Sequence, residues 1–276
     1  MDDAVETGFW RLLRTGSRPV DLVGLVAVPV VLVAVYALPT GVKRGLVFDY
    51  THPTLLSAYT AHFVHFDPTH LLVNLGSYLL LAPTAYALAV FAGEQARFRV
   101  VFVVLVTALP VTLSALNLAV VRPRIGYGFS GLSMGLLAVT GLLVVEYTAQ
   151  TLSAGWCSRA DAPLVFFVEA TLIALAVRPH TTATLAVAAG AAVVAAGYAV
   201  AVGRRARAAD SLLHPTARRP GFAELAVVAC VALAGFPAVA FPANPTGDGT
   251  VLNLYTHLLG FAVTFVAAYS LPEIDA

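Results

Sequence analysis

The sequence predicts an all-α fold, a polytopic bundle of transmembrane helices, and three observations lead to this prediction. First, 59% of the 276 residues are hydrophobic and 11% are charged, whereas soluble domains carry roughly 25% charged residues. Second, apolar stretches of about 20 residues recur along the chain, which is the length that a helix needs to cross a bilayer. Third, most basic residues fall in alternate connections between these stretches, as in multi-pass membrane proteins.

Eight apolar ranges are expected to form helices: 20–39, 70–92, 98–121, 129–150, 162–178, 181–203, 222–241 and 252–270. The fifth range is short and contains Glu169, so 162–203 is expected to form either two spans or one tilted or broken hairpin. Pro110 is expected to kink the third range. We treat 1–276 as a single membrane domain, with an interfacial segment at 1–19 and an arginine-rich cytoplasmic loop at 204–221.

The distribution of basic residues predicts a cytoplasmic N-terminus. In that orientation eleven of the 16 Lys and Arg residues lie in inner segments, and five lie in outer segments, namely Lys43, Arg44, Arg122, Arg124 and Arg178. An even number of spans then places the C-terminus in the cytoplasm too. The first apolar range lacks a small-residue cleavage site, which favours an uncleaved anchor. The chain is therefore expected to be a multi-pass protein of the cell membrane.

Five polar residues stand at the start of three apolar ranges. Because the second, fourth and eighth ranges are all expected to begin on the outer side, these residues should share one depth and one face of the membrane. Polar groups in hydrocarbon are costly and mark functional sites by default. The five residues are His65, His70, Asn74, Ser130 and His257.

A serine and a histidine at one depth suit nucleophilic catalysis. A neutral imidazole can take the proton of an adjacent serine hydroxyl near pH 7. Ser130 and His257 are therefore predicted to form a dyad. No carboxylate is expected to complete a triad, since the nearby acidic residues, Asp67 and Asp248, lie in flanking loops.

Acyl transfer also requires hydrogen-bond donors directed at the developing oxyanion. The backbone N–H of Ser130, the Asn74 amide and a ring nitrogen of His70 are the expected donors. His70 and Asn74 are four residues apart, so they share one face of their helix.

Glycines near the expected dyad predict close helix approach, because small residues let membrane helices pack until their backbones touch. Gly128, Gly131 and Gly135 flank the serine, and Gly260 follows His257 by three residues. The serine does not stand in a Gly-x-Ser-x-Gly elbow, because Leu132 occupies the last position and no strand is expected before it.

Together these motifs resemble those of the rhomboid intramembrane serine proteases. Gly128-Phe-Ser130-Gly131 is similar to the Gly-x-Ser-Gly motif of that family, His65…His70…Asn74 to its second-helix motif, and His257-Leu-Leu-Gly260 to the motif of its last core helix. The resemblance implies Ser130 as nucleophile, His257 as general base, and His70 and Asn74 as oxyanion-hole side chains. His65 would have a structural or water-organising role.

The resemblance also implies an endopeptidase that cleaves transmembrane protein substrates in the lipid bilayer, near the outer membrane boundary, without a metal or other cofactor. A net charge of +1 gives no case for binding nucleic acid.

The chain departs from the family pattern at several places. The family has a six-helix core, whereas about two extra helices are expected here between the serine and the histidine. Many members carry an aromatic residue four positions after the serine, where this chain has Met134. The first outer loop, 38–53, is short and lacks a Trp-Arg pair, and Thr264 stands where a small residue is common. The short loop bears on substrate gating, and Met134 offers no ring face to pack on the histidine. An inserted pair of helices preserves the parity that puts the serine and the histidine on one side.

Two other classes of protein remain alternatives. A catalytically inactive rhomboid-like relative would bind membrane clients, although such proteins usually lack the serine or the histidine. A small-solute membrane transporter would use the polar residues to line a pathway, although its charged residues would more naturally lie mid-membrane on several helices. Taken singly, Ser130 is more typical of a helix cap and Asn74 of an interhelical hydrogen bond.

Overall fold

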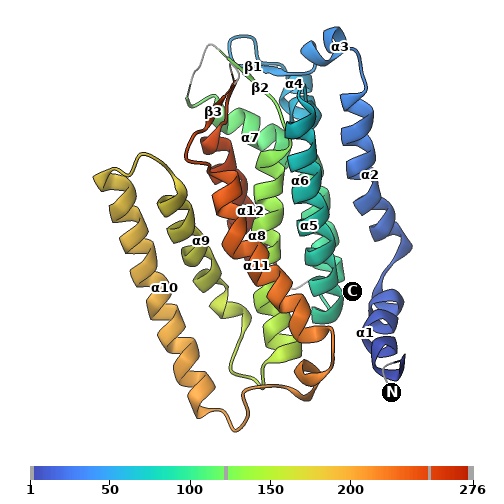
Figure 1. Ribbon diagram of the computed structural model, residues 1–276, viewed down its shortest axis with the longest axis vertical. Helices are drawn as coiled ribbons and strands as arrows, with labels where there is room; N and C mark the ends of the chain where they lie inside the picture. Colours follow the sequence, from blue (N-terminus) through green and yellow to red (C-terminus); the bar gives the residue numbers. More distant parts are fainter. Residues whose placement is uncertain (1–2, 121–123, 248–249, 273–276) are drawn as a thin grey trace.

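The computed structural model describes residues 3–120, 124–247 and 250–272, and helices make up most of it (Figure 1). Arg122 and Asp248, named above, lie outside the described residues. The helices, in chain order, are α1 (Asp3–Gly16), α2 (Pro19–Tyr36), α3 (Thr40–Arg44), α4 (Leu55–Thr60), α5 (Pro68–Ala92), α6 (Gln95–Thr107), α7 (Leu109–Asn117), α8 (Ser130–Tyr147), α9 (Ala162–Ala176), α10 (Thr182–Ala208), α11 (Phe222–Ala240) and α12 (Leu254–Ser270).

Short elements connect these helices. Four single turns are η1 (Ala61–Phe63), η2 (Thr148–Leu152), η3 (Arg159–Asp161) and η4 (Pro215–Arg218). Two antiparallel strand pairs join β1 (Phe48–Asp49) to β2 (Ile125–Gly126), and β3 (Thr246–Gly247) to β4 (Thr250–Val251). In the first pair Phe48 lies opposite Gly126. The expectation that no strand precedes Ser130 is thus wrong, although β2 has only two residues.

Each of the eight expected apolar ranges contains a helix. Five helices are long and apolar enough to cross a membrane: α2, α5, α8 extended through η2, α10 and α11. The pair α6 and α7 would make a sixth span if counted as one. Helices α9 and α12 are apolar but shorter, with 15 and 17 residues.

The third expected range, 98–121, is not one continuous helix. Helices α6 and α7 meet at a bend of 46°. Pro110 is the second residue of α7, a position that tolerates its missing N–H, and inside a longer helix it would remove a hydrogen bond and clash with the preceding turn. The kink expected at Pro110 is therefore present, with a short interruption of the helix at the bend.

The arginine-rich segment 204–221 is also partly helical, because α10 continues through Ala208. Arg205 and Arg207 lie in its last turn, where cations interact favourably with the helix dipole. The connection expected from residue 204 therefore begins at residue 209.

Helix α8 occupies the centre of the bundle, and every residue from Gly131 to Tyr147 is buried. Figure 1 shows α9 and α10 along one edge and α1 and α2 along the opposite edge. Helix α10 is the most exposed of the long apolar helices, with 17% of its apolar window buried. Large apolar side chains are exposed on α2, α5, α10 and α11. Apolar surface of this extent is typical of proteins that contact other apolar matter, such as lipid.

Helices α5, α8 and α12 run parallel, so their N-terminal ends lie together. At the other end Arg97 contacts Glu146 near the end of α8 and the carbonyl of Ala268 near the end of α12. Thr151, which follows α8, donates to the carbonyl of Phe91 near the end of α5. We call the N-terminal ends of α5, α8 and α12 the site end, and their C-terminal ends the arginine end.

Candidate active site

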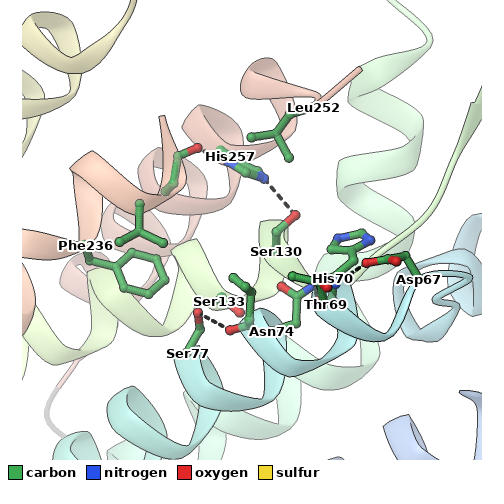
Figure 2. Close-up of a pocket in the computed structure, with 13 residues that line it drawn as sticks. Asp67, Thr69, His70, Asn74, Ser77, Ser130, Ser133, Phe236, Leu252 and His257 are labelled. Carbon is green, nitrogen blue, oxygen red and sulfur yellow. Dashed lines mark hydrogen bonds between the residues drawn. The ribbon is translucent and has the colours of Figure 1, made fainter. Parts of the chain in front are cut away.

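The hydroxyl of Ser130 lies 2.7 Å from Nε2 of His257 (Figure 2). Ser130 is the first residue of α8, and His257 lies in the first turn of α12. These residues are 127 positions apart in sequence. The distance is within the range of a hydrogen bond between a nucleophile and its general base.

Two glycines allow this approach, because the backbones of α8 and α12 touch beside the dyad. A Cβ atom at Gly260 would collide with the carbonyl oxygen of Gly131. A Cβ atom at Gly131 would lie 2.7 Å from Cγ2 of Thr256. Side chains at either position would push the two helices apart, and with them Ser130 and His257.

The second ring nitrogen of His257 is held by the main chain. Nδ1 lies 2.8 Å from the carbonyl oxygen of Ala240, the last residue of α11. A carbonyl oxygen only accepts, so Nδ1 carries the hydrogen of the neutral ring and Nε2 is left to accept from Ser130. The Ala240 carbonyl is available because the last four carbonyls of a helix have no partner within it.

The ring of Phe241 packs edge-on against His257, with ring centroids 5.8 Å apart. Sequence reasoning looked for an aromatic partner four residues after the serine, but Met134 is fully buried in the core. Phe241 and the Ala240 carbonyl were both missed. A backbone carbonyl has no side-chain signature, and nothing in the local sequence links Phe241 to a histidine 16 positions later.

The turn before Ser130 directs the start of α8 toward the cavity. Gly128 has a φ of +108°, a conformation that L side chains rarely adopt, and its N–H donates to the carbonyl of Ala61 at 3.0 Å. The carbonyl of Phe129 accepts from Leu132 and Ser133. The N–H of Ser130 lies in the first turn of α8, where the N–H groups have no acceptor within the helix. This N–H and the positive end of the helix dipole favour negative charge beside the serine.

His70 lies against this turn. A Cβ atom at residue 128 would approach Cε1 of His70 to 2.7 Å and Nε2 to 2.9 Å. The His70 ring also meets the ring of His65 edge-on, at 4.8 Å between centroids. Gly128 therefore allows the imidazole of His70 to lie directly beside the residues that precede Ser130.

The amide of Asn74 is engaged in this resting arrangement. Its Nδ2 lies 2.9 Å from Nε2 of His65 and 3.1 Å from the carbonyl oxygen of His70. Burial lowers the pKa of His65 to about 3, so its ring is neutral and can accept from the amide. Both N–H groups of Asn74 are therefore used, and its carbonyl oxygen is the group left for the cavity. To stabilise an oxyanion, Asn74 must first release one of these contacts.

Asp67 has a local structural role. Its carboxylate accepts from the backbone N–H of His70 at 2.8 Å and so caps the N-terminus of α5. The Ala240 carbonyl occupies the place on His257 that a carboxylate holds in a catalytic triad.

A second polar cluster fixes the start of α12. The side-chain oxygen of Asn117 accepts from Nδ2 of Asn253 at 2.8 Å and from the hydroxyl of Thr256 at 3.1 Å. Asn253 also caps α12 by accepting from the N–H of Thr256 at 3.2 Å. Asn117 is 2% exposed. This cluster ties the residue before His257 to α7.

These elements enclose a cavity of about 200 Å³ between α5, α8, α11 and α12. Four of the predicted site residues line the cavity: His70, Asn74, Ser130 and His257. The other four contact these residues or their helices without lining the cavity: His65, Gly128, Gly131 and Gly260. The lining residues are Asp67, Thr69, His70, Val73, Asn74, Ser77, Ser130, Ser133, Phe236, Val239, Ala240, Leu252 and His257 (Figure 2). The arrangement has the nucleophile, base and donors that acyl transfer requires.

Comparison of this chain with known protein families, with curated proteins and with solved structures finds no match.

Proposed function

We propose that this chain is a rhomboid-like intramembrane serine endopeptidase. The observation that carries the proposal is the 2.7 Å contact between the hydroxyl of Ser130 and Nε2 of His257, in a ring whose other nitrogen donates to a main-chain carbonyl. A serine that only caps a helix needs no such oriented base. The three motifs that resemble the rhomboid family supply the residues of this site.

In the proposed mechanism His257 takes the proton of Ser130 while the serine oxygen attacks a peptide carbonyl carbon. The tetrahedral oxyanion is stabilised by the Ser130 N–H and the His70 ring, with Asn74 joining once one of its N–H groups is released. His257 then protonates the leaving amine, and an acyl-enzyme remains. A water molecule, deprotonated by His257, hydrolyses this ester and restores Ser130.

The proposal includes the setting of the reaction. The substrates are transmembrane proteins in the lipid bilayer, and no cofactor takes part. The rhomboid-like core consists of α2, α5, the α6–α7 pair, α8, α11 and α12, and the α9–α10 hairpin is the extra pair. Both termini are cytoplasmic and the site end faces outward in the cell membrane. The long apolar helices and the distribution of basic residues support this placement.

A fluorophosphonate probe tests the proposal without knowledge of the substrate, because it phosphonylates an activated serine with loss of fluoride. We expect the purified wild type in lipid to be labelled, with labelling lost in Ser130→Ala and lowered on the order of 10²–10⁴-fold in His257→Ala. Thr140→Val is the matched control, since Thr140 is buried on the same helix and bonds only to the carbonyl of Leu136. Labelling that survives Ser130→Ala, or a folded wild type that stays unlabelled, would contradict the proposal.

A further inference from the structure

Ser133 shares the cavity with Ser130 but lies deeper in the bundle. The two serines are three residues apart on α8, so they occupy one helix face. Both line the cavity. With a rise of 1.5 Å per residue, Ser133 lies about 4.5 Å further along the helix axis than the nucleophile. It is therefore too deep to bind the oxyanion and stands at the inner end of the cavity.

The hydroxyl of Ser133 has no hydrogen-bond partner among the residues that the structure describes, and the residue is 1% exposed. Several other helical hydroxyls bond to the carbonyl four residues earlier, as Ser77 does to Val73 and Thr140 to Leu136. Thr264 in α12 also has a buried hydroxyl without a partner among the described residues, but it does not line the cavity. A buried hydroxyl without a partner is costly and calls for a functional explanation. Ser133 thus holds an unused donor at the wall of the cavity.

Acceptors line the same cavity. The oxygen of Ser77 keeps lone pairs after donating to Val73, and Asn74 has its carbonyl oxygen left because both of its N–H groups are used. Figure 2 shows Ser77 and Asn74 on α5, facing α8. Val73, Phe236 and Val239 add apolar side chains to the lining. The cavity therefore combines apolar walls with a donor and acceptors that lie deeper in the bundle than Ser130.

We propose that Ser133 and the acceptors of Ser77 and Asn74 form a subsite for a hydroxyl-bearing side chain, serine or threonine, on the substrate residue that supplies the scissile carbonyl. The inference rests on the proposed protease function. When the scissile carbonyl carbon lies at the Ser130 oxygen, the substrate side chain extends from Cα through Cβ to its hydroxyl. This length and one hydrogen bond together span the distance from Ser130 to Ser133 along the helix axis. That hydroxyl accepts from Ser133 and donates to Asn74 or Ser77.

Two peptide α-ketoamides test this subsite. They are identical except that one carries serine and the other 2-aminobutyrate beside the ketone, so a methyl group replaces the hydroxyl at nearly constant size. The Ser130 oxygen adds to the ketone carbon of either compound. The serine proton passes through His257 to the ketone oxygen, and no group leaves. Binding is measured as protection of the purified full-length protein in lipid against the fluorophosphonate.

We expect the wild type to bind the serine compound about five- to tenfold more tightly than the 2-aminobutyrate compound. This ratio should fall to near one in Ser133→Ala, persist in Ser133→Thr and persist in the control Thr140→Val. Ser133→Ala should also unfold at the same or a higher temperature, because it removes an unpaired buried hydroxyl.

A wild-type ratio near one, or an unchanged ratio in Ser133→Ala, would overturn the subsite. The wild-type comparison is decisive even if a variant fails to fold. The fluorophosphonate reports the reactivity of Ser130 directly. If the wild type is labelled but does not distinguish the two compounds, only the subsite is overturned. If a folded wild type is not labelled, the protease function and the subsite are both overturned.

Discussion

The two ends of the α8–α12 pair hold the same helices together with different chemistry. At the arginine end Glu146 lies 3.2 Å from Arg97 and 3.5 Å from Arg159. Arg159 also donates to the carbonyls of Tyr269 and Leu271, both at 2.7 Å. At the site end the contacts are neutral, from Ser130 through His257 to the carbonyl of Ala240.

The two ends differ in the charge of the groups that hold them. Charges fix the arginine end, where the cations also satisfy the last carbonyls of α12. A carboxylate in that place, as in a catalytic triad, would add a negative charge to the site end. A carbonyl orients the ring without adding charge. Ion pairs thus hold the arginine end, and hydrogen bonds between neutral groups hold the site end.

Breaking the arginine end should have the largest effect on stability. In Glu146→Gln the buried guanidinium of Arg97 and the partly buried one of Arg159 lose their shared carboxylate, and breaking a buried ion pair costs about 3–5 kcal/mol. We expect a lower unfolding midpoint in detergent, with fluorophosphonate labelling retained by the fraction that stays folded. Glu94→Gln is the control, because Glu94 lies 4.0 Å from Arg97 and is more exposed, and it should cost about 1 kcal/mol or less. Equal losses in both variants would refute a special role for Glu146.

Separating the helices at the site end should affect activity more than stability. In Gly260→Ala the new methyl group would collide with the carbonyl of Gly131. Overpacking of this kind costs about 1–3 kcal/mol, and displacing a catalytic group by about 1 Å can lower rates on the order of 10²-fold. The labelling rate and the unfolding midpoint are measured together. Gly190→Ala in α10, where a Cβ atom meets nothing within 4 Å, should leave both nearly unchanged.

A smaller effect should come from the polar cluster that fixes the start of α12. Thr256→Val keeps the methyl group that packs on Gly131 but removes the hydrogen bond to Asn117, whose loss costs about 0.5–1.5 kcal/mol. We expect a several-fold slower labelling rate. Thr256→Ser is the reciprocal control, since it keeps the hydroxyl and removes the methyl group. If Thr256→Val is labelled at the wild-type rate and Thr256→Ser is labelled slowly, then packing on Gly131 positions His257, and the hydrogen bond to Asn117 does not.

The sequence indicated where the helices and the candidate site residues lie, but not how the residues are engaged. Apolar runs set the ranges of α2, α5, α8 and α11 to within a few residues, because hydropathy is carried by consecutive side chains. The kink expected at Pro110 is present as the 46° bend between α6 and α7, but the sequence did not show that the helix is interrupted there. The contact between His65 and Asn74 was not foreseen, because it depends on how the loop before α5 folds back onto that helix.

By itself the sequence determined that helices begin at the serine and close to the histidine, with glycines where their backbones must touch. These are local properties of residue type and spacing. Only the tertiary structure decided that the carbonyl of Ala240 orients His257, that Phe241 supplies the ring against it, and that Ser133 has no hydrogen-bond partner among the described residues. Each of these depends on the arrangement of helices distant in sequence, and a backbone carbonyl or an unmade hydrogen bond leaves no mark in the order of residues.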